Sequence, residues 1–208
     1  MISVLVANGK GGCGKTTIAT NLATAFANTG LKTALADCDR QRSCLTWLKR
    51  RPKDAPRIHA LDWRKSVDDP PESIERLVID TGAGLTSSRV QELLKQANML
   101  VMPVLPSVFD EKATRLFLKK ADELKPIRRG KKPVAVVGNR MRPRTRAEGE
   151  LDAFLDGLGH EVAARFRDRA IYPEVARRGL GIFDLSPARR AGIVDDWLPL
   201  VRLIESQV

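Results

Sequence analysis

Apolar, β-branched segments alternate along the chain with segments that carry apolar residues at helical spacing. The first segment, residues 2–7, is a short apolar run that ends at a glycine-rich turn, as a buried strand does. After it, Ile18, Leu22 and Phe26 recur at helical spacing, and Gly30 is placed to end the helix. The start of the chain therefore predicts a strand followed by a helix.

The same alternation continues to the end of the chain. Further strands are expected at residues 32–37, 76–80, 98–104, 132–139 and near 161–166, with a short one around 57–60. Helices are expected at 41–50, after the strand at 76–80 as far as Gln96, near 110–125, and from Pro187 to Ser206, where Ser186 is the expected N-cap. Strands that are apolar on both faces and alternate with helices form a parallel sheet covered on both sides. We therefore expect an α/β fold with a mostly parallel, twisted sheet.

We expect residues 1–208 to form a single domain, since this length suits one full-sized core. The proline-rich, weakly periodic segment 51–75 is interpreted as a loop or insertion. Because the first expected strand begins at residue 2, no N-terminal helix-turn-helix domain is expected.

The segment "GKGGCGKT", residues 9–16, matches the phosphate-loop pattern G-x-x-x-x-G-K-[ST] and lies between an expected strand and helix. Its glycines allow successive backbone N–H groups to point at phosphate oxygens, at the positive end of the following helix. Lys15 is expected to reach the β- and γ-phosphates and the Thr16 hydroxyl to bind Mg²⁺. The residues expected to bind nucleotide are Gly11, Gly12, Cys13, Gly14, Lys15, Thr16 and Thr17. This loop predicts a protein that binds a nucleoside triphosphate.

A second lysine, Lys10, precedes the turn and has no role toward its own phosphates. With it, "KGGCGKTT" resembles the deviant phosphate loop, K-G-G-x-G-K-[ST], of the ParA/MinD family of ATPases. The resemblance implies a P-loop fold and a dimer that sandwiches two ATP molecules. It also implies that Lys10 reaches the partner's nucleotide and stabilises charge in the transition state.

The segment "ADCDRQRS", residues 36–43, resembles the D-x-D-P-Q motif of the same family. The resemblance implies that Asp39 positions the attacking water near the γ-phosphate and Mg²⁺, with Asp37 as its supporting neighbour. Arg40 stands where the family has proline, which changes the loop that carries Asp39.

Three later segments extend the resemblance. Residues 77–84, "LVIDTGAG", resemble the Walker B strand and second switch, which implies that Asp80 holds a magnesium-bound water. In residues 136–141, "VVGNRM", Asn139 follows a strand and stands where relatives often use an asparagine to contact the edge of the adenine base. Residues 165–183 resemble the family segment that forms the loop beneath the adenine base, together with the short helix and the glycine that follow this loop. Lys10, Lys15 and Asp39 are thus the expected catalytic residues, and Thr16, Asp39 and Asp80 the expected magnesium site.

The chain is strongly basic, with a formal net charge of +11 and a pI of about 10.0, which indicates a polyanionic partner. The resemblance implies that the ATP-bound dimer binds DNA without sequence preference through basic residues late in the chain. The candidates are Arg167, Arg169, Arg177, Arg178, Arg189 and Arg190. A denser basic run lies between Lys112 and Arg146, with thirteen basic and two acidic residues. Either DNA or an acidic protein could be the binding partner of this run.

The resemblance implies a ParA-like ATPase that positions or partitions a plasmid, a chromosome or another cargo, and whose hydrolysis a ParB-like or adaptor protein stimulates. We expect a cytoplasmic, nucleoid-associated protein with reduced cysteines. The alternative is a MinD-like ATPase on a membrane. The tail at 195–208 has Trp197, Leu200 and Ile204 at helical spacing but is acidic overall, which favours packing in the core over an anionic bilayer.

Overall fold

Seven strands form one sheet in the computed structural model, which describes residues 1–106 and 108–207, with the backbone alone at 108–110. The strands are β1 (Ile2–Val6), β2 (Thr33–Asp37), β3 (Ile58–Asp62), β4 (Arg76–Asp80), β5 (Met99–Val104), β6 (Val134–Met141) and β7 (Glu161–Arg167). Their order across the sheet is β3-β2-β4-β1-β5-β6-β7, and every neighbouring pair is parallel. The predicted α/β class and parallel sheet are confirmed.

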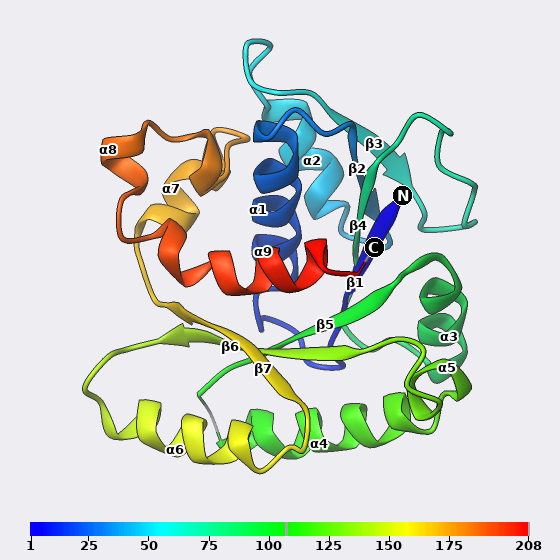
Figure 1. Ribbon diagram of the computed structural model, residues 1–208, viewed down its shortest axis with the longest axis vertical. Helices are drawn as coiled ribbons and strands as arrows, with labels where there is room; N and C mark the ends of the chain where they lie inside the picture. Colours follow the sequence, from blue (N-terminus) through cyan, green and yellow to red (C-terminus); the bar gives the residue numbers. More distant parts are fainter. Residues whose placement is uncertain (107, 208) are drawn as a thin grey trace.

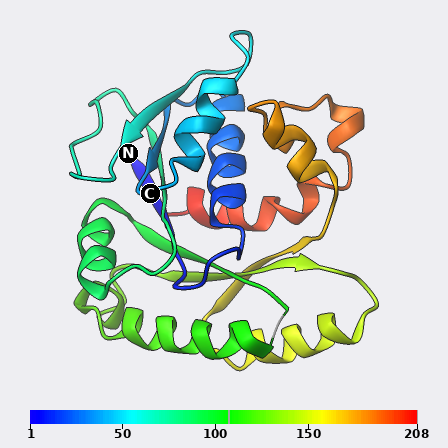
Figure 2. The ribbon, with the colours of Figure 1, turned by 180° about the vertical axis from the view of Figure 1, so that it is seen from behind.

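Helices cover both faces of this sheet (Figure 1 and, from behind, Figure 2). The α-helices are α1 (Lys15–Asn28), α2 (Ser43–Arg50), α3 (Ser87–Gln96), α4 (Val108–Asp122), α5 (Lys125–Arg128), α6 (Arg146–Asp156), α7 (Ile171–Arg177), α8 (Pro187–Arg190) and α9 (Leu198–Glu205). Two 3-10 helices are η1 (Ile182–Asp184) and η2 (Val194–Asp196). One core lies between the sheet and α1, α2, α7 and α9, and a second lies between the sheet and α3, α4 and α6. Both cores form because the strands are apolar on both faces.

The segment after Ser186 is not the single helix that its pattern predicts. It forms α8, η2 and α9 in succession, because Gly192 adopts a left-handed φ of 67° and Pro199, which has no N–H to donate, lies in the first turn of α9. Trp197 and Ile204 are nonetheless 1% and 0% exposed, and Trp197 stacks on Phe166 with ring centroids 4.0 Å apart. The predicted packing of the tail into the core is therefore confirmed.

The carboxyl ends of three adjacent strands meet at one edge of the sheet. Val6 at the end of β1 pairs with Asp80 at the end of β4, and Asp37 at the end of β2 pairs with Asp80 from the other side. Each of these strands leads into one of the motifs that the sequence singles out. Parallel α/β sheets bind ligands at this edge, so the register itself brings the motifs together.

Candidate nucleotide-binding site

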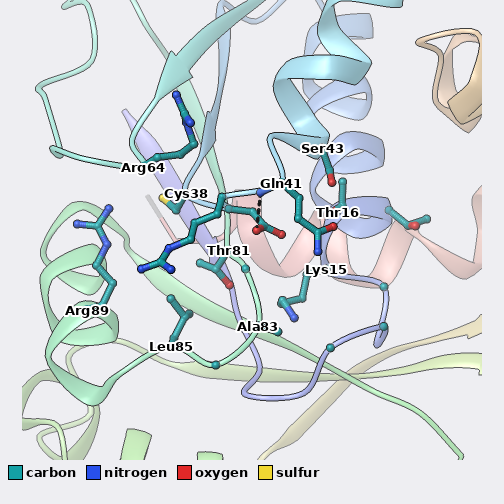
Figure 3. Close-up of a pocket in the computed structure, with 18 of the residues that line it drawn as sticks. Lys15, Thr16, Cys38, Gln41, Ser43, Arg64, Thr81, Ala83, Leu85 and Arg89 are labelled. Atoms are coloured by element: carbon teal, nitrogen blue, oxygen red, sulfur yellow. Dashed lines mark hydrogen bonds between the residues drawn. The ribbon is translucent and has the colours of Figure 1, made fainter.

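A cavity of about 790 Å³ opens at this edge of the sheet (Figure 3). Lys15 and Thr16 lie on one side of it, and Arg64 and Arg89 lie on the other. Of the residues expected to bind nucleotide or metal, those that line the cavity are Gly11, Gly12, Gly14, Lys15, Thr16, Thr17 and Asp39. The structure therefore brings the phosphate loop and the D-x-D motif to one shared space.

The phosphate loop needs its glycines for two different reasons. Gly12 and Gly14 adopt left-handed φ values of 77° and 94°, which residues with a Cβ rarely adopt. In addition, a Cβ on Gly14 would lie 2.2 Å from the Asn139 side-chain nitrogen. Gly14 leads directly into α1, so the exposed backbone of Gly11 and Gly12 curls in front of a helix N-terminus. Such an arrangement attracts phosphate groups.

The two lysines of the loop take different positions. Lys15 is 6% exposed, and its Nζ donates to the backbone carbonyl of Lys10 at 2.7 Å, which holds the ammonium group inside the loop. Lys10 is half-buried, and its backbone N–H donates to the Asn8 side chain at 3.2 Å. Lys15 lines the cavity, whereas Lys10 is not among the described residues that line it. The role of Lys10 toward a nucleotide stays a prediction.

Asp80 is fully buried, outside the residues that line the cavity, and its carboxylate is only partly satisfied. Its Oδ2 accepts hydrogen bonds from the Thr16 hydroxyl at 2.8 Å and from the Cys44 thiol at 3.1 Å. Its Oδ1 is buried and has no hydrogen-bond partner among the described residues. Burial raises the pKa of Asp80 to about 7, against the lowering effect of the Cys44 and Thr16 hydrogen bonds.

This arrangement fits a Mg²⁺ ion. The unpartnered carboxylate oxygen and the Thr16 hydroxyl are hard oxygen ligands, and Mg²⁺ commonly uses one or two carboxylates, water and the phosphates of its substrate. Within the described residues no group of three or more His, Cys, Asp or Glu side chains is arranged to hold a metal by itself. The donor set therefore fits a metal that arrives with a nucleotide.

Asp37 and Asp39 occupy different environments. Asp37 is fully buried and accepts backbone N–H bonds from Asp39 at 2.9 Å and Leu45 at 3.0 Å, and burial raises its pKa. Asp39 lines the cavity, and its carboxylate accepts from the Gln41 N–H at 3.0 Å. Asp37 thus anchors the turn that presents Asp39, and its supporting role in hydrolysis stays a prediction.

Sequence reasoning missed several residues of the site. Gly82 is one: a Cβ there would lie 3.0 Å from the Asp39 carboxylate, so this glycine lets the two motif loops approach each other. Four arginines also line the cavity, namely Arg40, Arg64, Arg89 and Arg140. They come from four separate segments, and no local pattern marks three of them. Of these four arginines, only Arg40 is marked in the sequence, because it stands where the family motif has proline.

Asn139 and the late arginines are placed as follows. The Asn139 side chain, 7% exposed, donates to the backbone carbonyl of Cys13 at 2.7 Å, so it supports the phosphate loop, and its reading of an adenine edge stays a prediction. Arg167 donates to the Asp196 carboxylate at 2.9 Å, and Arg169 lies 3.8 Å from the same group. Two further arginines have partners as well: Arg189 pairs with Glu174 at 2.7 Å, and Arg190 donates to the Phe183 carbonyl at 3.1 Å. Arg177 and Arg178 are exposed.

Comparisons with known proteins agree with this geometry. Residues 4–162 match the family model of the CobQ/CobB/MinD/ParA nucleotide binding domain. The chain is 26% identical over 197 residues to "Maintenance of carboxysome distribution protein A" of Halothiobacillus neapolitanus, covering 91% of this chain and 90% of that protein.

Two solved structures share the fold. The first is the MinC:MinD cell division protein complex of Aquifex aeolicus, with a TM-score of 0.77, 18% identity and coverage of 99% of this chain and 96% of that chain. The second is a putative plasmid partition protein of Borrelia burgdorferi bound to AMPPNP, with a TM-score of 0.76, 15% identity and coverage of 100% and 99%. The family match spans all the strands that carry the site, and the chain therefore belongs to the CobQ/CobB/MinD/ParA family of nucleotide-binding domains.

Proposed function

We propose that this protein is a ParA-type ATPase that hydrolyses ATP with Mg²⁺ and uses the cycle to position a large cargo. The observation that carries the proposal is the pair formed by the Thr16 hydroxyl and the buried Asp80 carboxylate, whose Oδ1 has no partner among the described residues, next to a cavity that Thr16 and Lys15 line. Family membership and the binding of AMPPNP by a relative of the same fold support a nucleoside triphosphate as the ligand.

Each residue of the site has a proposed role. The loop N–H groups and Lys15 bind the phosphates, and Asn139 supports the loop and contacts the adenine. Thr16 and Asp80 hold Mg²⁺, and Mg²⁺ bound there neutralises charge on the β- and γ-phosphates. Asp39, held by its turn at the cavity wall, orients the attacking water.

The proposed active form is a dimer that sandwiches two ATP molecules. Lys10 reaches the nucleotide of the partner and stabilises the charge that develops on it. The ATP-bound dimer binds DNA without sequence preference, which the net charge of +11 supports. An adaptor or ParB-like protein stimulates hydrolysis, the dimer separates and DNA is released, so that the protein associates with the nucleoid in cycles.

The similarity to a carboxysome distribution protein over 90% of that protein's length favours a large intracellular assembly as the cargo. Partition of plasmids or chromosomes uses the same cycle, and the motifs of the site do not distinguish between these cargoes. The described residues include no helix long and apolar enough to cross a membrane. In the MinD-like alternative Trp197 and Ile204 would contact the membrane, whereas here both side chains are packed in the core.

The test of this proposal compares the wild type with Lys10→Ala, and Lys53→Ala serves as a control because Lys53 is an exposed lysine outside the site. Molar mass is measured by light scattering with ATP and with ADP, beside nucleotide affinity. We expect Lys10→Ala to bind ADP with unchanged affinity but to stay monomeric with ATP, while the control dimerises. A Lys10→Ala protein that dimerises normally with ATP contradicts the role in trans.

A second variant, Asp39→Ala, tests the hydrolysis step. It should accumulate as an ATP-bound dimer with at least tenfold slower turnover, because the attacking water loses its orienting carboxylate. Unchanged turnover removes Asp39 from the mechanism. Binding of the wild type to a random-sequence duplex, with ATP, with ADP and without nucleotide, then tests the DNA step.

A further inference from the structure

The exposed face of α4 carries a row of cations. Lys112, Arg115 and Lys119 recur at intervals of three and four residues, so they lie on one side of the helix, and Lys120 extends the row. Lys112 and Lys119 are two turns apart, about 10 Å along the helix. The row continues past the end of α4, where the exposed basic residues are Lys125, Arg128, Arg129 and Lys131. We call these eight residues the α4–α5 basic face, and α4 and α5 lie on the same side of the sheet in Figure 1.

No carboxylate among the described residues pairs with a cation of this face. Within residues 1–106 and 108–207, none of the eight cations forms an ion pair, and Arg115 stacks on Phe154 with its guanidinium 4.7 Å from the ring centroid. The nearby Asp122 is engaged with His160 at 3.2 Å. Three of the six late arginines differ, since Asp196 pairs with Arg167 and Arg169, and Glu174 pairs with Arg189, whereas Arg177 and Arg178 form no ion pair among the described residues. A cation that already has a carboxylate partner must give it up to contact a phosphate.

The opposite face of α4 packs on the nucleotide site. The Phe117 ring covers Gly9 at the start of the phosphate loop, where a Cβ would lie 3.4 Å from the ring. The Asn8 side chain donates to the Thr114 hydroxyl at 3.5 Å. Phe117 also shares a small cavity with Leu85, which belongs to the loop after β4 that lines the nucleotide cavity. The helix that carries the cations therefore touches both loops that contact a bound nucleotide.

We propose that the α4–α5 basic face is the surface with which the ATP-bound form holds the phosphate backbone of duplex DNA. This proposal rests on the proposed function and names the surface that its DNA step uses. Rows of Lys and Arg without carboxylate partners bind phosphates independently of sequence. A duplex fits better than a single strand, because Phe117 is buried and the side chains that the structure describes on α4 include no exposed aromatic ring on which bases stack. A duplex also fits better than a protein partner, because Leu116 is the one large apolar side chain exposed among the described residues of α4.

The test uses three triple variants of the full chain, each of which removes three positive charges. The first replaces cations of the α4–α5 basic face: Lys112→Ala, Lys119→Ala and Lys120→Ala. The control replaces exposed cations elsewhere: Lys53→Ala, Lys65→Ala and Arg202→Ala. The third replaces late arginines: Arg177→Ala, Arg178→Ala and Arg189→Ala. Alanine suits exposed helix positions, and Lys53 and Lys65 lie in exposed loops, so the fold should be retained; thermal unfolding and ATP affinity verify this for each variant.

Affinity for a random-sequence duplex is measured with ATP over a salt series. We expect the first variant to lose at least tenfold in affinity at 150 mM salt, with a salt dependence less steep by about 0.9 for each lysine that contacts a phosphate. The control should lose less than threefold. Equal losses in the first variant and the control overturn the proposal, because they indicate bulk charge.

The remaining outcomes separate the inference from the proposed function. If the wild type binds DNA only with ATP and the late-arginine variant alone loses affinity, the proposed function stands and the α4–α5 basic face is not its DNA surface. If the wild type binds duplex DNA in no nucleotide state, the DNA step and this inference both fail. An acidic polypeptide bound by the wild type in place of DNA, and lost in the first variant, assigns the face to a protein and also overturns the proposal.

Discussion

The buried ion pair between Arg51 and Asp184 ties three distant segments together, and Asp184→Asn should destabilise the protein strongly. The side chains of Arg51 and Asp184 are 6% and 2% exposed. The Asp184 carboxylate accepts two bonds from Arg51 at 2.8 Å, one from Asn28 at the end of α1 at 2.8 Å, and one from the Gly181 N–H at 2.8 Å. Burial raises the pKa of Asp184, but Arg51, Gly181 and Asn28 together outweigh burial and hold the pKa below its usual range.

Loss of the carboxylate leaves the Arg51 guanidinium buried without its counter-charge and faces it with an amide N–H₂ group. Breaking a buried pair in this way costs about 3–5 kcal/mol. With an m-value of about 2 kcal/mol/M, the urea midpoint should fall by roughly 2 M. Urea unfolding without nucleotide measures this, because a bound ligand would add its own stabilisation.

The dependence on pH has a definite sign. Because the folded-state pKa is below that of the unfolded chain, the ion pair contributes its full stability above pH 4 and loses it as the pH falls through the folded pKa. The difference between wild type and Asp184→Asn should therefore be constant from pH 6 to pH 8 and shrink below about pH 4. Asp152→Asn is the matched control, since Asp152 pairs with Arg165 at the surface and should cost less than about 1 kcal/mol. A loss below 1 kcal/mol for Asp184→Asn at pH 7 refutes the reasoning.

Three further predictions follow from the same structure. Without nucleotide, Asp80→Asn should raise the thermal unfolding midpoint, because it removes a poorly satisfied buried carboxylate; a lower midpoint would contradict this. In the same thermal shift assay, the variant should lose the additional stabilisation that Mg²⁺ gives in the presence of ATP. Gly179→Ala should lower the free energy of unfolding in urea by at least about 3 kcal/mol, because φ is 68° and a Cβ would lie 2.4 Å from the Arg51 backbone nitrogen. Gly192→Ala, where φ is 67° but no atom lies within 4 Å of the added Cβ, should lower it by about 1 kcal/mol. Equal losses in the two variants would contradict the steric argument. ATP should not increase the sedimentation of the wild type with zwitterionic vesicles, because Trp197 lies in the core and is not available to insert; ATP-dependent sedimentation would restore the membrane alternative.

The elements that could be predicted are those whose signal is local. A strand apolar on both faces, a glycine at the end of a helix and a glycine-rich loop between strand and helix are each contained in a few consecutive residues. Gly30 illustrates this, since it ends α1 with a φ of 84° where the pattern placed the end. The last helix could not be predicted as well, because the N-cap signal at Ser186 and the helical spacing of Trp197 and Leu200 lie on opposite sides of Gly192, which interrupts the segment.

The candidate site divides in the same way. The phosphate loop and the two acidic motifs are recognisable because backbone phosphate binding requires particular residues at fixed offsets. The partners of these residues are not local: Cys44 with Asp80, Asn139 with the Cys13 carbonyl, and Gly82 against Asp39 join separate segments. Such contacts depend on strand order, which puts β2, β4 and β1 side by side.

By itself, then, the sequence determined the α/β class, the parallel sheet and the residues of the phosphate loop, because backbone conformation and burial are encoded over short stretches. Only the tertiary structure decided which charges are free and which are neutralised. Arg167 and Lys119 are alike in sequence terms, yet Asp196, from η2, pairs with the first, and the second has no carboxylate partner among the described residues. An ion pair between distant segments depends on where the fold brings them, and that is set by the packing of helices on the sheet.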